Sequence, residues 1–382
     1  MVWFFNAFMR GHSVMFTSFG TMSRRCLAIG VLAAPLGAWA QAGPTTNDSA
    51  WRDANAAVGQ FKRGHADVLK WEQGEAQALA DAGDVPAGLQ LASSEAAVRQ
   101  VWRAHRDLAH VLAQAGADKV DLIASGKWDE IDPFLFRRID GLDEVVDVAA
   151  QARKAWTDAV SAQLRVTHVR AALGAAEAAS ALGQRMHSVG NWSALQYTDV
   201  QLAASAASMA LQREQYAAAQ AQARLIDLLQ LTGVYLSVQL PDRLPELPAK
   251  ALPDADIARR AREVQAQLPR ANRMRNQRDV ALTSQAYHRS HALARQARDE
   301  VLRRREFITE ETALQYNGML KSTWELLNAA GAQSLAAAGA VLAQRDFEIA
   351  RIDLQWVLLG GEPASAISLG GAGSDTPAAA GH

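Results

Sequence analysis

The sequence predicts an all-α chain built from two repeated long helical hairpins with coiled-coil-like contacts. Gly (26) and Pro (11) are sparse in 382 residues, which favours long helices over a fold with many turns. No proline lies between Pro133 and Pro241 or between Pro269 and Pro363, so each stretch can form continuous helix. Apolar residues in the predicted return helices recur at steps close to seven, as coiled-coil contacts require.

The N-terminal region has the pattern of an export signal. Arg24 and Arg25 precede an apolar run, and Ala38-Trp39-Ala40 supplies a small-x-small cleavage site. The run is about 14 residues long and contains Pro35, which is too short to span a bilayer. We expect residues 1–40 to be a cleavable signal peptide, and we expect a periplasmic protein, with association to the outer membrane left open. The sequence leaves open whether translation starts at Met1 or Met22.

Composition argues against several classes of function. Lys and Arg total 39 against 40 Asp and Glu, so no basic field is available for nucleic acid. A single cysteine excludes a disulfide scaffold and Cys-based zinc or iron–sulfur sites. No phosphate-binding Gly-rich loop, nucleophile elbow or His-Glu-x-x-His motif occurs. We therefore expect no enzyme, no catalytic residues and no cofactor.

Helix-breaking residues predict the organisation of the chain. Four prolines within 241–254 indicate an extended linker between two halves. We expect an N-terminal extended or helical segment at 41–88. The hairpin repeats follow at 89–240 and 255–361, and each opens with a short amphipathic helix. The tail at 362–382 carries too little apolar content to order itself.

Each half is predicted to hold one hairpin. In the first, a helix over roughly 137–188 turns at Val189-Gly190-Asn191 and returns from 193 to about 231. In the second, a helix over roughly 270–315 turns at Tyr316-Asn317-Gly318 and returns to about 359. Gly190 and Gly233 are 43 residues apart, as are Gly318 and Gly361, which indicates an internal repeat.

Heptad spacing predicts which faces of the return helices meet a partner. One stripe contains Leu195, Leu202, Met209, Tyr216 and Ala223. The other runs from Leu335 to Leu359 in alternating steps of three and four, with Arg345 as its one polar member. Such stripes keep one face of a helix toward its neighbour, so we expect both to be contact seams.

At the second turn the residues suggest a family. The run Tyr316-Asn317-Gly318-Met319-Leu320, followed by Trp324-Glu325-Leu326-Leu327-Asn328-Ala329, resembles the tip turn and next helix of TolC-like outer-membrane efflux proteins. Val189-Gly190 and Thr198-Asp199-Val200 form a weaker copy. The resemblance covers about residues 89–361.

The resemblance implies a TolC-type α-barrel protomer that conducts molecules outward with a periplasmic adaptor (membrane fusion protein) and an inner-membrane pump. The family's trimeric assembly makes a homotrimer possible, and the sequence leaves that point open. The resemblance also implies site residues. Adaptor contact would fall at Val189, Gly190, Asn191, Tyr316, Asn317, Gly318, Met319 and Leu320, and the residues lining a periplasmic aperture would be Asp199, Glu325 and Asn328.

One departure separates this chain from the family. Family members insert membrane strands of about 9–11 alternating residues at the end of the hairpins away from the tips. Residues 271–316 are instead charged and Arg-rich throughout, and 117–136 is too short for two strands. We therefore expect little or no β-barrel. The alternative function is a soluble periplasmic interaction or metal-handling protein derived from the same fold.

Metal ligands are weakly indicated. His288 and His291 lie three residues apart, on one face of a predicted helix, where two imidazoles can share a metal ion. Surface histidines in most proteins bind nothing, so we predict no metal site and keep this pair as the weak candidate. The sequence does not identify the exported substrate or say whether a barrel-bearing partner is needed.

Overall fold

The computed structural model describes residues 88–235 and 237–362. The predicted signal peptide, nearly all of the segment at 41–88 and the tail beyond Glu362 lie outside these residues. The described part is all-α apart from one two-stranded sheet, which confirms the predicted fold class. In that sheet β1 (Leu89–Gln90) pairs in parallel with β2 (Val238–Gln239), with Leu89 opposite Val238.

Short helices fill the region between the sheet and the first long helix. After Ser93, whose side chain caps the helix, comes α3 (Ser94–Ala104). The others are η1 (Arg106–Leu108), α4 (Ala109–Ala115), α5 (Ala117–Ser125), η2 (Trp128–Glu130) and α6 (Leu135–Arg138). The stretch at 117–136, where we expected no membrane strands, is thus mainly helical. Its Asp132 accepts a hydrogen bond from the Phe134 amide at 2.9 Å, as an Asx turn does.

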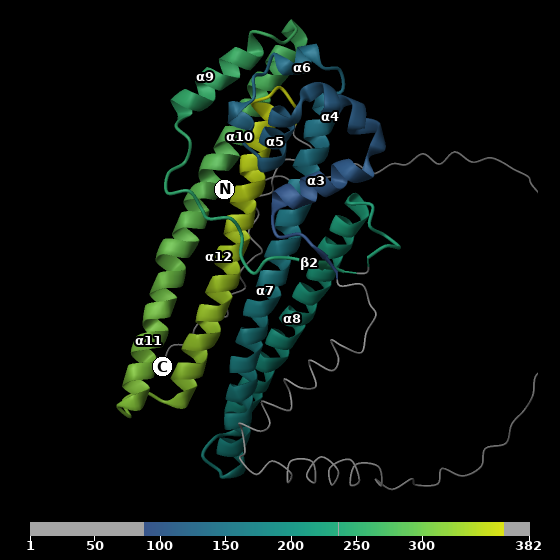
Figure 1. The fold of residues 1–382 in the computed structure, drawn as a ribbon. Coiled ribbons are helices and arrows are strands. Elements are labelled where there is room, and N and C mark those ends of the chain that lie inside the picture. Colours follow the sequence, from purple (N-terminus) through teal and green to yellow (C-terminus); the bar gives the residue numbers. More distant parts are fainter. Residues whose placement is uncertain (1–87, 236, 363–382) are drawn as a thin grey trace, which may run out of the picture. The chain divides into compact units, whose positions relative to one another are not determined.

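The first hairpin has one unbroken outgoing helix. α7 (Leu142–Ser188) has 47 residues and starts after Gly141, which adopts a left-handed conformation at φ 78°. The return helix α8 (Ala194–Leu228) has 35 residues. Figure 1 shows the two lying antiparallel.

The second hairpin has an interrupted outgoing helix. It consists of α10 (Arg270–Arg295), the π-helical segment η3 (Gln296–Leu302) and α11 (Arg303–Asn317). The long helix expected at roughly 270–315 is thus continuous from Arg270 to Asn317, but seven of its residues are π-helical, which the sequence did not predict. The return helix α12 (Thr323–Val357) again has 35 residues, and α9 (Asp254–Gln265) precedes the hairpin.

The π segment accounts for a one-residue difference between the hairpins. The residues before the outgoing helices, Gly141 and Pro269, are 128 positions apart. The caps of the return helices, Ser193 and Ser322, are 129 positions apart. A π-bulge accommodates one extra residue within a helix, so the second outgoing helix takes up its insertion at η3.

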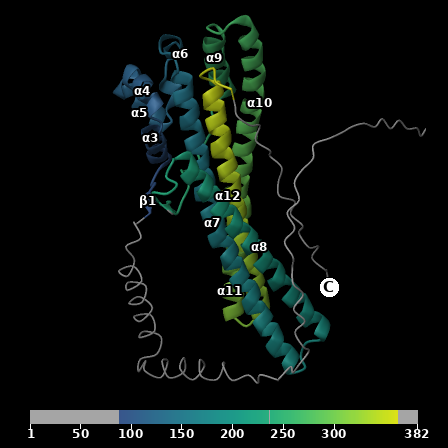
Figure 2. The ribbon, with the colours of Figure 1, turned by 90° about the vertical axis from the view of Figure 1, so that its right-hand side faces the viewer.

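The helices lie in the order α8, α7, α12 and then α10–α11. α7 packs along both α8 and α12, and α12 also packs against α10, η3 and α11. Figure 1 and Figure 2 both show the turns of the two hairpins at the same end, opposite α6 and α9. α7 and α12 are therefore the inner helices, while α8 and α10–α11 each keep an outer face.

The hydrophobic core lies at the end away from the turns. Its main cluster joins α3, α5 and η2 to the start of α7 and the ends of α8 and α12, around Trp128, Trp156 and Trp356. A second cluster joins the linker, α9 and α10 to α12 around Phe347. Toward the turns the buried hydrophobic residues are few and small, with one small cluster of Val169, Leu211 and Ala338 and isolated residues such as Ala179 and Val200. The long helices are thus held together mainly at the end away from the turns.

The two heptad stripes differ in how far they are buried. Most members of the α12 stripe, including Ala338, Ile349, Ile352 and Trp356, are buried. On α8, Leu195, Leu202, Met209 and Tyr216 are 51–72% exposed. Within the chain, α8 instead buries Val200, Leu211 and Leu225, so the expectation that its stripe is a contact seam stays a prediction about a partner.

Among the described helices, α12 is long and apolar enough to cross a membrane by length and composition. Its many alanines and two glycines lower its polarity, and small side chains also let neighbouring helices approach closely. The same composition suits its position between α7 and α10.

Candidate functional site

The turn of the first hairpin is closed by backbone hydrogen bonds and a capping box. Gly190 has φ 79°, and its amide donates to the His187 carbonyl at 2.9 Å. The Asn191 amide reaches back to the Met186 carbonyl, also at 2.9 Å. Ser193 then caps α8 reciprocally with Gln196. Glycine fits this left-handed position because a Cβ is strained there.

The turn of the second hairpin has the same hydrogen bonds with a different residue in the left-handed position. The Met319 amide donates to Tyr316 O at 2.9 Å, and the Leu320 amide to Gln315 O at 2.8 Å. Met319 has φ 60°, whereas Gly318 has φ −81°. The repeat pairing that matches Gly190 with Gly318 is therefore off by one, because Met319 occupies the position of Gly190.

Together the turns form an apolar tip, which we define as residues 189–192 and 316–324. The rings of Trp192 and Trp324 meet edge to face with centroids 5.4 Å apart, so the two hairpins touch here. A cavity of about 800 Å³ lies beside this pair, lined by Met186 and Tyr316 among others. Met319 is 94% exposed, and Val189 and Leu320 are exposed as well.

The structure gives Glu325 a local role. It is the third residue of α12, and its carboxylate accepts hydrogen bonds from the Ser322 amide at 2.9 Å and the Ser322 hydroxyl at 3.0 Å. Lys321 also pairs with it. The Lys321 ammonium and the Ser322 amide lower the pKa of Glu325 from 4.5 to about 2. This carboxylate is engaged in a helix cap, as the amide of Gln196 is in the first repeat.

The other two aperture candidates occupy equivalent places. Asp199 and Asn328 each lie six residues after the capping serine of their return helix, and both are exposed. Asp199 on α8 and Asn328 on α12 therefore occupy equivalent positions in the two repeats, with a carboxylate in one and an amide in the other. Whether either lines an aperture stays a prediction.

The pair His288 and His291 does not present two free imidazoles. His288 Nε2 lies 2.8 Å from Asp254 Oδ1, and His291 Nε2 lies 2.8 Å from the Pro248 carbonyl oxygen. His291 is buried. Within residues 88–235 and 237–362, no three His, Cys, Asp or Glu side chains are grouped to hold a metal ion.

A set of charged residues joins the two hairpins between α7 and α12. Lys154 pairs with the buried Asp353, and Arg345 donates to Asp158 at 2.6 Å. Burial raises the pKa of Asp353, and its pairing with Lys154 opposes that rise. Sequence reasoning noted Arg345 as the polar member of an apolar stripe, but did not see that its partner lies on the other hairpin.

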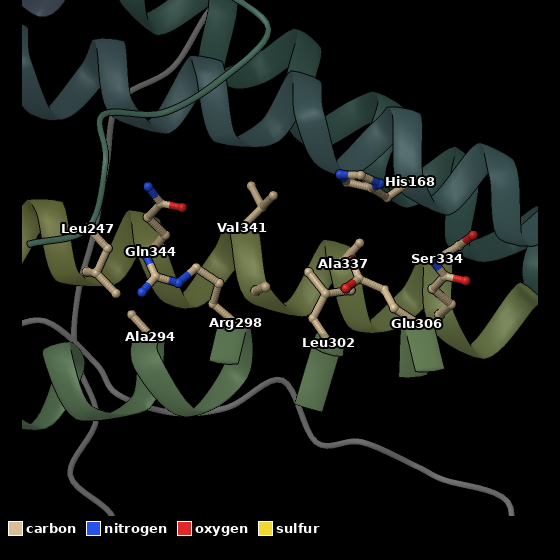
Figure 3. A pocket seen from close by; sticks show the side chains of 12 residues that line it. His168, Leu247, Ala294, Arg298, Leu302, Glu306, Ser334, Ala337, Val341 and Gln344 are labelled. Atoms are coloured by element: carbon tan, nitrogen blue, oxygen red, sulfur yellow. The ribbon is translucent and has the colours of Figure 1, made fainter. Parts of the chain in front are cut away.

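A cavity of about 340 Å³ lies among α12, the second outgoing helix and α7, and the π segment lines part of it (Figure 3). Arg298 and Leu302 of η3 face it, together with Glu306 of α11 and His168 of α7. Arg298 donates to Asp299 at 2.7 Å, and burial lowers the pKa of His168. The cavity thus combines a paired guanidinium, an imidazole whose pKa is lowered by burial and one carboxylate. Nothing in the sequence patterns indicated it, because η3 reads as ordinary helix.

Comparison with known proteins adds little to this geometry. No protein-family model matches the chain, and no curated protein sequence matches it. Its structure is similar to that of a membrane protein from Pseudomonas aeruginosa, with 15% identity, a TM-score of 0.45, and 63% of this chain and 74% of that chain covered. It is also similar to CusC, whose structures concern transmembrane channel formation, with 12% identity, a TM-score of 0.40, and 70% and 92% covered. Neither similarity assigns a function, since both TM-scores are below 0.5.

Proposed function

We propose that the chain is a TolC-like component of a tripartite efflux system and contributes a periplasmic helical conduit that docks an adaptor protein. The observation that carries this proposal is the pair of exposed apolar stripes on the outer helices. The tip residues support the second half of it. In a single chain both the stripes and the tip expose apolar side chains that a partner can cover.

The stripes lie on opposite edges of the helix array. The edge formed by α8 exposes Leu195, Leu202, Met209 and Tyr216 at seven-residue steps. The edge formed by α10–α11 exposes Leu293, Val301, Phe307, Ile308 and Leu314. Exposed apolar side chains in a continuous stripe indicate a protein contact surface, since burying them is favourable.

A second copy of this chain is the occupant that fits both edges. Both stripes run along long helices, one along α8 with its 35 residues and the other along the outgoing helix between Arg270 and Asn317, and heptad spacing suits helix-to-helix contact. If the α8 edge of one copy packs on the α10–α11 edge of the next, the contact is head-to-tail, and such contacts form a ring when the rotation between copies closes. A homotrimer ring of this kind would enclose a helical conduit.

The tip supports a docking role. Its exposed side chains include Met319 in a left-handed conformation that costs a non-glycine residue about 1–2 kcal/mol. Backbone strain of this kind persists where surrounding structure holds it and often occurs at functional sites. We propose that the tip receives the periplasmic adaptor, which in turn connects the conduit to an inner-membrane pump.

Cysteine cross-linking tests the ring. Leu202 lies eight residues beyond the start of α8, and Ile308 lies nine residues before the end of α11, so the two lie at comparable distances from the tip. In a Cys26→Ser background, Leu202→Cys with Ile308→Cys should form covalent oligomers under mild oxidation. Each single variant should stop at a dimer or monomer.

The control for this experiment is Ala203→Cys with Ile308→Cys. Ala203 is exposed but points about 100° away from Leu202 around the helix. It should cross-link poorly. A chain that stays monomeric by light scattering at micromolar concentration, with no Leu202–Ile308 product, would sink the conduit and favour the soluble alternative.

Charge placed on the tip tests docking. Met319→Glu with Leu320→Glu should abolish co-purification of the adaptor from envelope extracts, since two carboxylates replace apolar contacts. Met274→Glu alters an equally apolar, exposed residue of α10 far along the hairpin and should leave co-purification intact. Equal adaptor recovery with all variants would remove the tip from the proposal.

A further inference from the structure

A cavity of about 480 Å³ lies near the core end of the helices, where the linker and α9 cover α10 and α12. It is separate from both the tip and the α8 stripe. Its volume falls within the range of about 300–1,000 Å³ that is usual for small-molecule sites. Its walls come from five segments, so the fold rather than any local motif assembles it.

The inner wall is apolar. Trp128 of η2 and Tyr287 of α10 are 1% and 2% exposed, and Ile257 and Leu358 are buried beside them. The Trp128 indole donates to the Ile123 carbonyl at 2.8 Å, and the Tyr287 hydroxyl accepts from the Leu252 amide at 3.1 Å. Because these polar atoms are engaged within the protein, the rings offer mainly apolar surface to an occupant.

Behind this wall, positive charge is in excess. Arg351 lines the cavity and donates to Glu348 at 2.5 and 3.1 Å. Arg153 is 5% exposed, bonds the Ala124 carbonyl at 3.0 Å and has no partner for its Nε. Glu348, 3% exposed, interacts with both guanidinium groups. Burial and the nearby Arg351 lower the pKa of Arg153 to about 10, in keeping with a buried guanidinium whose Nε has no partner.

The rim is also cationic. Lys250, Arg259 and Arg260 line it, against Asp129 and Asp256. Arg259 and Arg260 pair with Glu263, and Arg259 also pairs with Asp256. In the part of the chain that the structure describes, no carboxylate pairs with Lys250. Lys250 is therefore available to an occupant, and Arg351 lines the cavity with its Nε and one Nη bonded to Glu348.

We propose that this cavity binds a small organic anion whose apolar, ring-sized body rests on Trp128 and Tyr287 and whose acidic group meets Arg351 and Lys250. A buried charge is costly unless it is paired, and one acidic group at Arg351 would pair the excess guanidinium charge. The apolar walls disfavour inorganic phosphate or a free metal ion. The site is independent of the conduit, since no residue of the tip or of the α8 stripe lines it.

A matched pair of fluorescent probes tests the proposal on the full-length chain. 1-Anilinonaphthalene-8-sulfonate carries an aromatic body and one negative charge, while N-phenyl-1-naphthylamine has the same body without the charge. We expect the sulfonate to bind saturably with one molecule per chain. The neutral probe should bind at least about tenfold more weakly, as expected for loss of one charge-assisted contact.

Two variants test the site in different ways, one by removing a charge and one by filling the cavity. Arg351→Gln removes the charge and should weaken sulfonate binding at least about tenfold, while Arg153 still compensates Glu348. Leu252→Trp fills the cavity from its exposed rim without changing charge and should weaken both probes. Arg303→Gln, on the exposed surface of α11, is the control and should leave both affinities unchanged.

Circular dichroism should report native helix content in every variant. The proposal is overturned if the sulfonate fails to bind saturably, if the neutral probe binds equally well, or if neither cavity variant alters the affinity while both remain folded. An unchanged cross-linking pattern in Arg351→Gln would separate this site from the proposed ring.

Discussion

The two hairpins share a topology but differ in how their outgoing helices reach the tip. In the first, α7 is unbroken and Gly190 takes the left-handed turn position. In the second, η3 absorbs an extra residue and Met319 occupies that position. The capping boxes that follow are equivalent, with Gln196 in one and Glu325 in the other. The repeat thus keeps its hydrogen bonds while its residues diverge.

This difference indicates separate demands on the two tips. A glycine relieves backbone strain and contributes no side chain, whereas Met319 keeps the strain and exposes a long apolar side chain. The second tip therefore offers contact surface at some cost in stability. The return helices differ in their packing, because α12 is packed on two sides while α8 is packed mainly on α7.

The largest expected loss of stability comes from removing the ion pair between Lys154 of the first hairpin and Asp353 of the second. Lys154→Met leaves Asp353 buried without its ammonium partner. An uncompensated buried charge costs about 3–5 kcal/mol, so the free energy of unfolding in urea should fall by that amount. Hydrogen exchange should then speed up along α12 near Asp353.

The matched control is Lys321→Met at the second tip, whose partner Glu325 is exposed. Exposed pairs contribute about 0–1 kcal/mol, so this loss should be small. Equal losses for the two lysine variants would mean that Asp353 is better solvated than its position between α7 and α12 indicates.

An intermediate effect comes from exchanging the turn residues. Gly190→Ala should destabilise the chain by about 1 kcal/mol, because an L residue is strained at φ 79° while its Cβ meets no neighbour. Met319→Gly relieves the equivalent strain and should stabilise the chain by up to about 1 kcal/mol, less the entropy that glycine adds to the unfolded state. Urea unfolding of both variants measures these shifts. Shifts of the same sign would contradict the equivalence of the two positions.

The smallest effect concerns the acidic cap. The pKa of Glu325 is about 2 in the folded chain against an ordinary value of 4.5. A lowered folded-state pKa means that the carboxylate contributes stability above pH 4.5 and loses that contribution as the pH falls toward 2. Glu325→Gln should therefore flatten the pH dependence of unfolding over this range. Gln196→Glu should add a similar dependence to the first hairpin, and no change in either profile would argue against the cap geometry.

Much of the architecture was predictable from local patterns. The absence of proline across 134–240 and 270–362 predicted the long helices, and the turn residues around Gly190 and Gly318 predicted where they reverse. The register of the repeat was not predictable from glycine spacing. Gly190 and Gly318 look equivalent in sequence, but one residue inserted at η3 moves the left-handed position to Met319.

The candidate sites depended more on tertiary contacts. Heptad spacing on α8 correctly marked an apolar stripe but could not tell that α7 packs on another face of that helix. Arg345 was visible as a polar residue in a stripe, while its bond to Asp158 joins residues 187 positions apart. The spacing of His288 and His291 suggested that they share a metal ion. In the structure His288 Nε2 instead lies beside the Asp254 carboxylate, and His291 Nε2 lies beside the Pro248 carbonyl oxygen.

The sequence by itself determined the helices, since helix formation depends on residues within one or two turns of each other and on the absence of breakers. It also determined where the hairpins reverse, because caps and turns are local. Only the tertiary structure decided which apolar stripe is covered, which buried charges meet across α7 and α12, and how five segments enclose the cavity beside Arg351. Burial and charge pairing depend on neighbours distant in sequence, so their outcome appears only when the helices are packed.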